Sequence, residues 1–246
     1  MPRRAWPRPN TPLLNLAIEE AIYRWCKTCT GVALVWVNRE SVIAGRNSRE
    51  GLDYSCHYSR LYGVPVYRRF TGGGAVYHSP DTLSVTIIGR GRLSPPSLYE
   101  KYAVLIARAL ALLGLEAWIA NEGDIVVSGC KVGGSAAHIG RNRHLYHAVI
   151  SYRLPGYVSQ LTPPRRDRLA MGVDPVKYRP CGLERRGVRK EEVLDAITSF
   201  LEWEGYEVHD LWRYAALSGL IGRALELAVS RASDPFWWPC RPFTAL

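Results

Sequence analysis

The sequence predicts an α+β fold in which a mixed, mainly antiparallel sheet is flanked by helices. The β-rich runs are short and are joined by polar or glycine-containing turns, and few helices lie between them. The regular βαβ alternation of a parallel sheet is absent. With 246 residues, of which 47% are hydrophobic, the chain can bury a core for one large domain or two small ones.

The first third of the chain predicts one helix followed by a series of strands. Apolar residues recur at helical spacing between Thr11 and Lys27, and Pro12 suits the first turn of a helix. Short runs rich in β-branched and aromatic residues then predict strands at 32–38, 41–45, 64–70 and 83–88. A sheet is therefore expected to form directly after the first helix.

The rest of the chain predicts more strands and three further helices. Ser97 and Glu100 form a capping box after two prolines and predict a helix that ends near Leu115. Strands are expected at 117–120, 124–129 and 145–152, and a proline- and arginine-rich loop at 162–168. A helix around 193–201 and another over 209–231 precede an aromatic tail at 234–243.

The formal net charge is +10, with a pI near 9.5, which suits nucleic acid, a membrane surface or an acidic protein as a partner. Only five of the 32 basic residues are lysines, so a lysine within a motif is less readily explained as background surface charge. No run approaches the roughly 18 to 20 apolar residues of a membrane-spanning helix. The basic N-terminus is followed by no apolar segment of a secretory signal, so we expect a cytoplasmic protein without a membrane partner.

The six cysteines are scattered, with one C-x-x-C pair at Cys26 and Cys29. A structural zinc site needs a second pair at matching spacing, and the sequence has none. We expect the pair to lie near a helix end as ordinary buried or half-buried residues. A disulfide is expected only if the cytosol is unusually oxidised.

Residues 68–78 have the sequence RRFTGGGAVYH, a glycine-rich loop between two strand-like runs. Consecutive glycines are retained where the backbone needs positive φ or close approach, and their N–H groups can surround an anion. Arg68 and Arg69 add charge and a bidentate fork for phosphate or carboxylate. The alternative is a tight β-turn with an incidental arginine pair. The segment is neither a Walker loop nor a Rossmann fingerprint, because no GK[ST] follows and a strand comes next.

A second segment, residues 121–136, contains Lys131 at the start of a strand that runs into two glycines. A lysine there can neutralise charge that develops on a carboxylate or phosphate during acyl transfer. The alternative is a solvated lysine on a hairpin. Asp124 can be a metal ligand, the partner of Lys131 or a solvated residue. His147 alternates with apolar neighbours and, by itself, indicates a hydrogen-bonded core histidine.

Taken together, these segments resemble the lipoate-protein ligase family, within the superfamily that includes biotin ligases and octanoyl transferases. The resemblance rests on six motifs that occur in the family's order and spacing. They are LNLAIEEA (14–21), SVIAGRN (41–47), RRFTGGGAVYH (68–78), GCKVGGSA (129–136), LYHAVI (145–150) and SRASDPFWW (230–238). Together they span nearly the whole chain.

The resemblance implies a single catalytic domain over residues 1–246, without the C-terminal accessory domain of larger ligases. It also implies the fold of biotin ligases and class II aminoacyl-tRNA synthetases, and an enzyme that uses Mg²⁺ and ATP to convert lipoate to lipoyl-AMP. An acceptor lysine then takes the lipoyl group. The expected acceptor is an acidic lipoyl domain of a 2-oxoacid dehydrogenase E2 or a glycine-cleavage H-like protein, and a separate accessory protein is an expected further partner.

Carried over by position, Lys131 is the expected catalytic residue. The residues expected to bind ATP or lipoyl-AMP are Arg69, Gly72, Gly73, Gly74, Ala75, Val76, Tyr77, His78 and Lys131. Those expected to line the acyl pocket or support these groups are His147, Ser135 and Asp124, and Asp124 is also a candidate ligand for Mg²⁺.

Several departures from the family pattern keep alternatives open. The family has aspartate directly after the loop histidine, whereas this chain has Asp81 three residues after it. Cys181 lies in a PCG sequence that resembles the nucleophile of octanoyl transferases, which take the acyl group from acyl carrier protein through a thioester. A biotin ligase would need a GRGRxGR-type loop. A non-enzymatic nucleic-acid binder is the remaining alternative, with the aromatic residues 236–238 stacking on bases.

Overall fold

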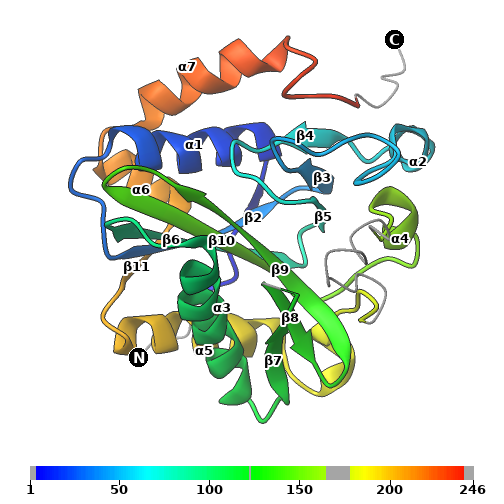
Figure 1. Ribbon diagram of the computed structural model, residues 1–246, viewed down its shortest axis with the longest axis vertical. Coiled ribbons are helices and arrows are strands. Elements are labelled where there is room, and N and C mark those ends of the chain that lie inside the picture. Colours follow the sequence, from blue (N-terminus) through cyan, green and yellow to red (C-terminus); the bar gives the residue numbers. More distant parts are fainter. Residues whose placement is uncertain (1–3, 122, 165–177, 241–246) are drawn as a thin grey trace.

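The computed structural model describes residues 4–121, 123–164 and 178–240, which contain two β-sheets (Figure 1). Within these residues the larger sheet has the strand order β1 (Pro9–Asn10), β2 (Val32–Asn38), β6 (Thr82–Arg90), β10 (Arg143–Ser151), β9 (Cys130–Ile139), β8 (Asp124–Val127) and β7 (Ala117–Ala120). A further strand, β11 (Glu207–Asp210), also pairs with β2. β1 and β11 run parallel to β2, and the other neighbours are antiparallel. The predicted mixed, mainly antiparallel sheet is confirmed.

The smaller sheet presents the glycine-rich loop. Its order is β4 (Val66–Arg68), β3 (Ser41–Ala44) and β5 (Ala75–His78), with β3 parallel to β4 and antiparallel to β5. The chain leaves β4, forms the loop and returns as β5 on the other side of β3. Both ends of the loop are therefore fixed to the same central strand.

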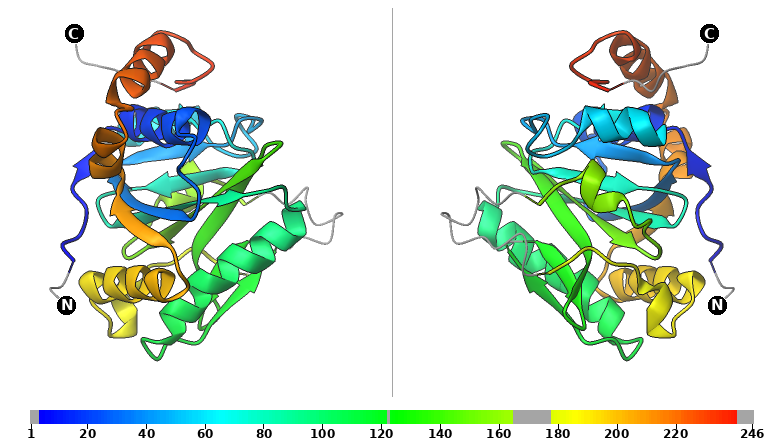
Figure 2. Two further views of the ribbon diagram at one scale, coloured as in Figure 1. Left: turned by 90° about the vertical axis from the view of Figure 1, so that its left-hand side faces the viewer. Right: turned by 90° about the vertical axis from the view of Figure 1, so that its right-hand side faces the viewer.

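Helices cover both faces of the larger sheet (Figure 2). On one face lie α3 (Pro95–Ala111) and α5 (Lys190–Trp203). On the other lie α1 (Pro12–Trp25) and α6 (Leu211–Leu217), with α7 (Ile221–Ala232) packed against the outside of α1. The remaining described helical segments are α2 (Cys56–Tyr62), α4 (Val158–Leu161) and a 3-10 turn at Leu183–Arg186.

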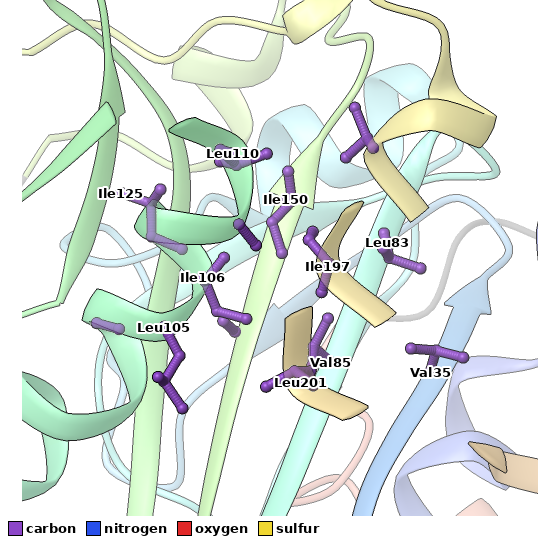
Figure 3. Close-up of a cluster of buried hydrophobic side chains, with 14 of the residues drawn as sticks. Val35, Leu83, Val85, Leu105, Ile106, Leu110, Ile125, Ile150, Ile197 and Leu201 are labelled. Carbon is purple, nitrogen blue, oxygen red and sulfur yellow. The ribbon is translucent and has the colours of Figure 1, made fainter. Parts of the chain in front are cut away.

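Strand β2 shows why the sheet needs helices on both faces. All seven of its residues are buried, although successive side chains of a strand point to opposite faces. Val35 and Val37 belong to the core under α3 and α5, part of which is drawn in Figure 3. Leu34 and Trp36 belong to the core under α1. Trp36 thereby reaches the cavity described below.

Two predicted helices differ from the structure. The N-cap of α3 is Ser94, whose Oγ accepts from the Ser97 N–H at 3.2 Å, so the proposed Ser97–Glu100 capping box is wrong. The two prolines occupy the first turn, where their missing N–H groups cost no helical hydrogen bond. The helix predicted over 209–231 is two helices, α6 and α7, because the chain turns at Gly219 with φ of 68°.

The cysteines differ most from the expectation. All six are paired in disulfides, Cys26–Cys29, Cys56–Cys240 and Cys130–Cys181. Their Cα–Cα distances are 5.4, 5.4 and 6.0 Å, within the usual range. The C-x-x-C pair does lie at the end of α1, as predicted, but not as free thiols. Spacing along the chain did not indicate pairs as distant as Cys56 and Cys240.

Two sequence expectations fall partly outside the described residues: the loop predicted at 162–168 beyond residue 164, and the aromatic tail beyond residue 240. Within the described tail, Arg231 of α7 stacks on the Trp237 ring at 3.7 Å and Trp238 stacks on Tyr67. These two rings therefore pack against the protein. Among the described helices, none is long and apolar enough to cross a membrane.

Candidate active site

A cavity of about 610 Å³ opens between the smaller sheet and the β8–β9 hairpin. This volume falls within the range of small-molecule and cofactor sites. We call residues 68–78 the glycine loop and residues 124–136 the lysine hairpin. The glycine loop contributes Arg69 and Gly73–His78 to the lining, and the hairpin contributes Asp124 and Lys131–Ala136. Of the site residues predicted from the sequence, the cavity brings together all except Gly72 and Cys181.

The glycine loop is shaped by a close approach to the end of β3. Gly45 N–H donates to the Gly74 carbonyl at 3.1 Å, and Arg46 N–H donates to that of Thr71 at 2.8 Å. A Cβ on Gly45 would lie 2.1 Å from the Gly73 carbonyl oxygen, so only glycine fits there. Gly73 itself has φ of 86°, which is the reason for one of the three loop glycines.

The arginine pair does not present its forks to a ligand as expected. Arg68 does not line the cavity, and its guanidinium donates to the carbonyls of Gly45, Arg46, Ser48 and Phe236. Arg69 lines the cavity but is buried, and it donates to Thr71 Oγ1 and to the carbonyls of Ile43, Gly72 and Gly74. Burial lowers the pKa of Arg69 to about 10, so it keeps its charge at neutral pH. Both arginines hold the loop in shape.

The lysine hairpin places Lys131 across the cavity from the glycine loop. The turn between β8 and β9 uses Ser128 and Gly129, both at positive φ, and a register shift separates Ile125 from Val126. Lys131 Nζ lies 2.6 Å from Asp124 Oδ1, and both side chains are partly exposed. Asp124 is thus the partner of Lys131, one of the readings that the sequence left open. The Lys131 ammonium group is therefore held in the cavity by a single carboxylate.

A buried hydrogen-bond chain connects the loop to α1. Arg69 Nε donates to Thr71 Oγ1, which lies 3.0 Å from His147 Nε2, and His147 Nδ1 lies 2.9 Å from Glu19 Oε1. Because an arginine only donates and a carboxylate only accepts, the chain runs from Arg69 through Thr71 and His147 to Glu19. Sequence reasoning missed Glu19. The available signal was a pair of glutamates inside an otherwise apolar helix.

His78 lines the cavity beside Trp36. Their ring centroids are 6.1 Å apart, and Asn38 Nδ2 lies 3.2 Å from His78 Nδ1. Burial, together with Arg69 and His147, lowers the pKa of His78 to about 3. The ring is therefore neutral at physiological pH, which suits the lining of an apolar acyl pocket. Trp36 is a lining residue that the sequence did not single out.

Two further polar residues line the cavity. Ser135 donates from Oγ to the Gly123 carbonyl at 2.9 Å, so it supports the turn before Asp124. Asp53, which sequence reasoning missed, is 3% exposed and accepts from the Arg49 N–H at 2.8 Å. A Cβ on Gly74 would lie 3.4 Å from Asp53 Oδ1, so the carboxylate faces the glycine loop.

Asp81 and Cys181, the two residues on which the alternatives depend, are not available in the cavity. Asp81 lies outside the cavity lining, and Cys181 is part of a disulfide. Asp81, considered as a substitute metal ligand, pairs with Lys190 at 3.4 Å and Arg153 at 3.9 Å and does not line the cavity. Cys181, the alternative nucleophile, is bonded to Cys130 and has no thiol in this form. The Cys181 side chain is half-buried.

Comparisons with known proteins agree on one family. The lipoyl protein ligase A/B catalytic domain matches residues 11–197. A relative from Aeropyrum pernix, named "Putative lipoate-protein ligase A", is 35% identical over 93% of this chain and 88% of its own length. The lipoate-protein ligase LplJ of Bacillus subtilis is 32% identical over 58% of this chain, which spans only 43% of that protein.

Solved structures share the fold. A lipoate-protein ligase A bound with ATP has a TM-score of 0.72 at 20% identity, covering 93% of this chain and 92% of that one. LipL1 of P. falciparum in complex with lipoate has a TM-score of 0.70 at 20% identity, covering 95% and 73%. A bipartite ligase, studied with its E2 lipoyl domain from Thermoplasma acidophilum, has a TM-score of 0.72 at 20% identity, covering 97% and 96%. The match over most of its length, together with this fold, makes the chain a member of the lipoyl protein ligase A/B catalytic domain family.

Proposed function

We propose that the protein is a lipoate-protein ligase, which activates lipoate with ATP and transfers the lipoyl group to a lysine of an acceptor protein. The observation that carries the proposal is Lys131, paired with Asp124, opposite the glycine loop across one cavity. Relatives described as bound to ATP and to lipoate support the same substrates.

In the first half-reaction the lipoate carboxylate attacks the α-phosphate of ATP. A carboxylate oxygen–phosphorus bond forms, the bond to the β-phosphate oxygen breaks, and pyrophosphate leaves. Lys131 leaves Asp124 and neutralises the charge shared by carboxylate and α-phosphate. The glycine loop offers its backbone to the nucleotide, and Arg69 acts by fixing that backbone.

In the second half-reaction an acceptor lysine amine attacks the activated carbonyl. An amide bond forms, AMP leaves, and the amine gives up its proton. Asp124, once released from Lys131, is a carboxylate in the cavity that can receive that proton or orient the amine. The acyl chain would lie beside Trp36 and His78, because the indole is largely apolar and the histidine is neutral.

Magnesium fits the site only as an ion held mainly by the nucleotide. The described residues contain no group of three or more His, Cys, Asp or Glu that could hold a metal. Mg²⁺ with ATP commonly uses one or two carboxylates, with phosphates and water completing its octahedron. Asp124 can supply one such carboxylate, and Mg²⁺ would screen the phosphate charge.

The alternative function, octanoyl transfer through a Cys181 thioester, requires a free thiolate. The disulfide with Cys130 removes that thiol, which favours the ligase. The deciding experiment incubates the pure chain with lipoate, Mg·ATP and an apo lipoyl domain, and in parallel with octanoyl carrier protein without ATP. We expect the acceptor to gain the lipoyl mass only in the first mixture.

One control and two contrary outcomes make this experiment decisive. An acceptor whose target lysine is replaced by arginine should gain no mass, and lipoyl-AMP should accumulate in its place. Mass gain only from octanoyl carrier protein would overturn the ligase and support the transferase. A chain that binds a polyanion in about 0.5 M salt and acylates nothing would favour the nucleic-acid alternative.

The finer identity of the partners belongs to the same proposal. We propose an acidic acceptor, either an E2 lipoyl domain or an H-like protein, because the chain carries a net charge of +10. We also propose that residues 1–246 act as one catalytic domain with a separate accessory protein, by analogy with the bipartite archaeal ligase. Association with the acceptor should slow as ionic strength rises, and a rate independent of salt would contradict the charge argument.

A further inference from the structure

The segment from Tyr178 to Cys181 forms the wall of the cavity directly beside Lys131. Tyr178, Arg179 and Pro180 all line the cavity. Lys131 N–H donates to the Arg179 carbonyl at 3.0 Å, and Cys181 N–H donates to the Lys131 carbonyl at 2.9 Å. The segment thus pairs with the backbone of the lysine itself, as a short parallel bridge. Any shift of the segment therefore moves the backbone that carries Lys131.

A disulfide closes this pairing covalently. Cys130 precedes Lys131, and Cys181 follows the lining residues of the segment, so the S–S bond encloses the two backbone hydrogen bonds. The two cysteines are 51 residues apart in sequence, and their bond ties the second strand of the lysine hairpin to a segment outside the sheet. Apart from the disulfide, these two backbone hydrogen bonds join the segment to Lys131.

The three disulfides differ in their access to solvent. Cys26 and Cys29 are 8% and 2% exposed, and Cys56 and Cys240 are 4% and 0% exposed. Cys130 and Cys181 are only half-buried. A thiol in solution must reach a sulfur atom to attack it, so exposed disulfides are the ones that exchange readily. The disulfide nearest the candidate catalytic lysine is therefore the one most open to reduction.

We propose that Cys130 and Cys181 are positioning residues, whose disulfide holds Lys131 and the wall beside it in the geometry that acyl activation requires. The proposal rests on the function proposed above. As a consequence, the thiol–disulfide state of this pair sets the rate of lipoyl-AMP formation.

The reduction balances with any dithiol as the electron donor. A thiolate of the dithiol attacks one sulfur of the Cys130–Cys181 bond, and a mixed disulfide forms. The second thiol of the donor resolves it, so the donor becomes a disulfide while Cys130 and Cys181 receive two electrons and two protons. In the reduced form the wall can shift against Lys131. Displacement of a positioned group by about 1 Å can cost up to a hundredfold in rate, and we expect a loss of about tenfold here.

The test compares Cys130→Ser/Cys181→Ser with Cys26→Ser/Cys29→Ser, which removes a buried disulfide at the end of α1. Single-turnover formation of lipoyl-AMP is measured well below the unfolding temperature of each variant. The first variant should be about tenfold slower than the oxidised wild type at saturating lipoate and ATP. The second should keep the wild-type rate, and its rate should still fall when it is reduced. Reductant is removed anaerobically before lipoate is added, because it would also open the dithiolane ring of lipoate.

Two measurements that need no activity accompany the rates. Alkylation of the native protein after mild reduction, read by mass spectrometry, should label Cys130 and Cys181 before the other four cysteines. Hydrogen exchange should quicken in peptides that contain the amides of Lys131 and Cys181, because these donate the two bridging hydrogen bonds.

Each outcome decides something. Equal rates for the oxidised wild type and Cys130→Ser/Cys181→Ser would overturn the positioning role. So would unchanged exchange at Lys131 after reduction, or alkylation of both cysteines in protein never exposed to reductant. An oxidised wild type that makes no lipoyl-AMP would instead refute the proposed function. The hydrogen-exchange data would still show whether the Cys130–Cys181 disulfide holds the backbone of Lys131.

Discussion

The two walls of the cavity are built in opposite ways. The glycine loop is held by buried arginines whose donors meet backbone carbonyls, and by glycines that allow its close approach to β3. The lysine hairpin depends on a partly exposed ion pair, two backbone hydrogen bonds and a half-buried disulfide. The difference separates two tasks. A wall that shapes a ligand must not move, whereas a lysine that follows charge during a reaction must be able to change partners.

The largest expected effect is on the stability of the glycine loop, which we call the rigid wall. Arg68→Ala removes the donor to four carbonyls and to the Tyr54 hydroxyl, so five hydrogen bonds, several of them buried, are lost. At about 1 kcal/mol for each lost hydrogen bond, we expect the free energy of unfolding to fall by about 3–5 kcal/mol. Denaturant titration measures it, with the exposed Arg46→Ala as the matched control. Equal midpoints for the two variants would contradict the structural role of Arg68.

The next effect separates chemistry from stability on the other wall. Lys131→Ala should slow lipoyl-AMP formation by about 10²–10³, the usual cost of losing one donor to developing charge. Its free energy of unfolding should change by less than about 1 kcal/mol, because a partly exposed ion pair contributes little. Rapid-quench assays of the variant beside the exposed-lysine control Lys101→Ala measure this. Undiminished adenylate formation would remove Lys131 from the mechanism.

These two cases also show how far sequence reasoning could reach. The sequence predicts a role for Lys131 because a lysine is rare in this chain and its motif is specific, and the structure places this residue in the cavity lining. The role of Arg68 could not be predicted, because an arginine that binds phosphate and an arginine that binds backbone carbonyls look the same in a sequence. Only the folded position of Gly45 and Phe236 decides between them. The fold could be predicted where hydrophobic periodicity was strong, as in α1 and β2. The prediction was wrong at Gly219, where one residue with positive φ divides a helical pattern into two helices.

Long-range pairings were beyond the sequence for the same reason. Glu19 was passed over as part of an amphipathic helix, although it ends the hydrogen-bond chain from Arg69. Cys130 and Cys181 lie 51 residues apart, and spacing carries no information about which cysteines meet. Motif order therefore identified the family and most of the cavity lining. The supports behind that lining, which come from other elements, required the structure.

A smaller effect tests the close approach at the base of the rigid wall. Gly45→Ala would place a Cβ 2.1 Å from the Gly73 carbonyl oxygen, and the backbone must shift to accept it. We expect a loss of about 1–3 kcal/mol in the free energy of unfolding and a higher KM for ATP. Gly72→Ala is the matched control for stability, because a Cβ there meets no atom within 4 Å and its φ is not positive. Similar thermal midpoints for both variants would show that the loop tolerates displacement.

The smallest expected effect is a pH dependence that comes from the buried histidine of the rigid wall. The pKa of His78 is lowered to about 3 by burial and by Arg69 and His147, whereas an unfolded histidine titrates near 6.5. Between these values the unfolded chain holds a proton that the folded protein lacks, so stability falls as the pH decreases through this window. The slope for one group is at most about 1.4 kcal/mol per pH unit.

His78→Asn should reduce the slope of unfolding free energy against pH between about 4 and 6. The lowered pKa values of His138 and His144 act in the same direction and remain in the variant, so part of the slope should persist. A variant with the same slope as the wild type would mean that His78 can take up its proton in the folded protein, and that the cavity beside His78 is open to water.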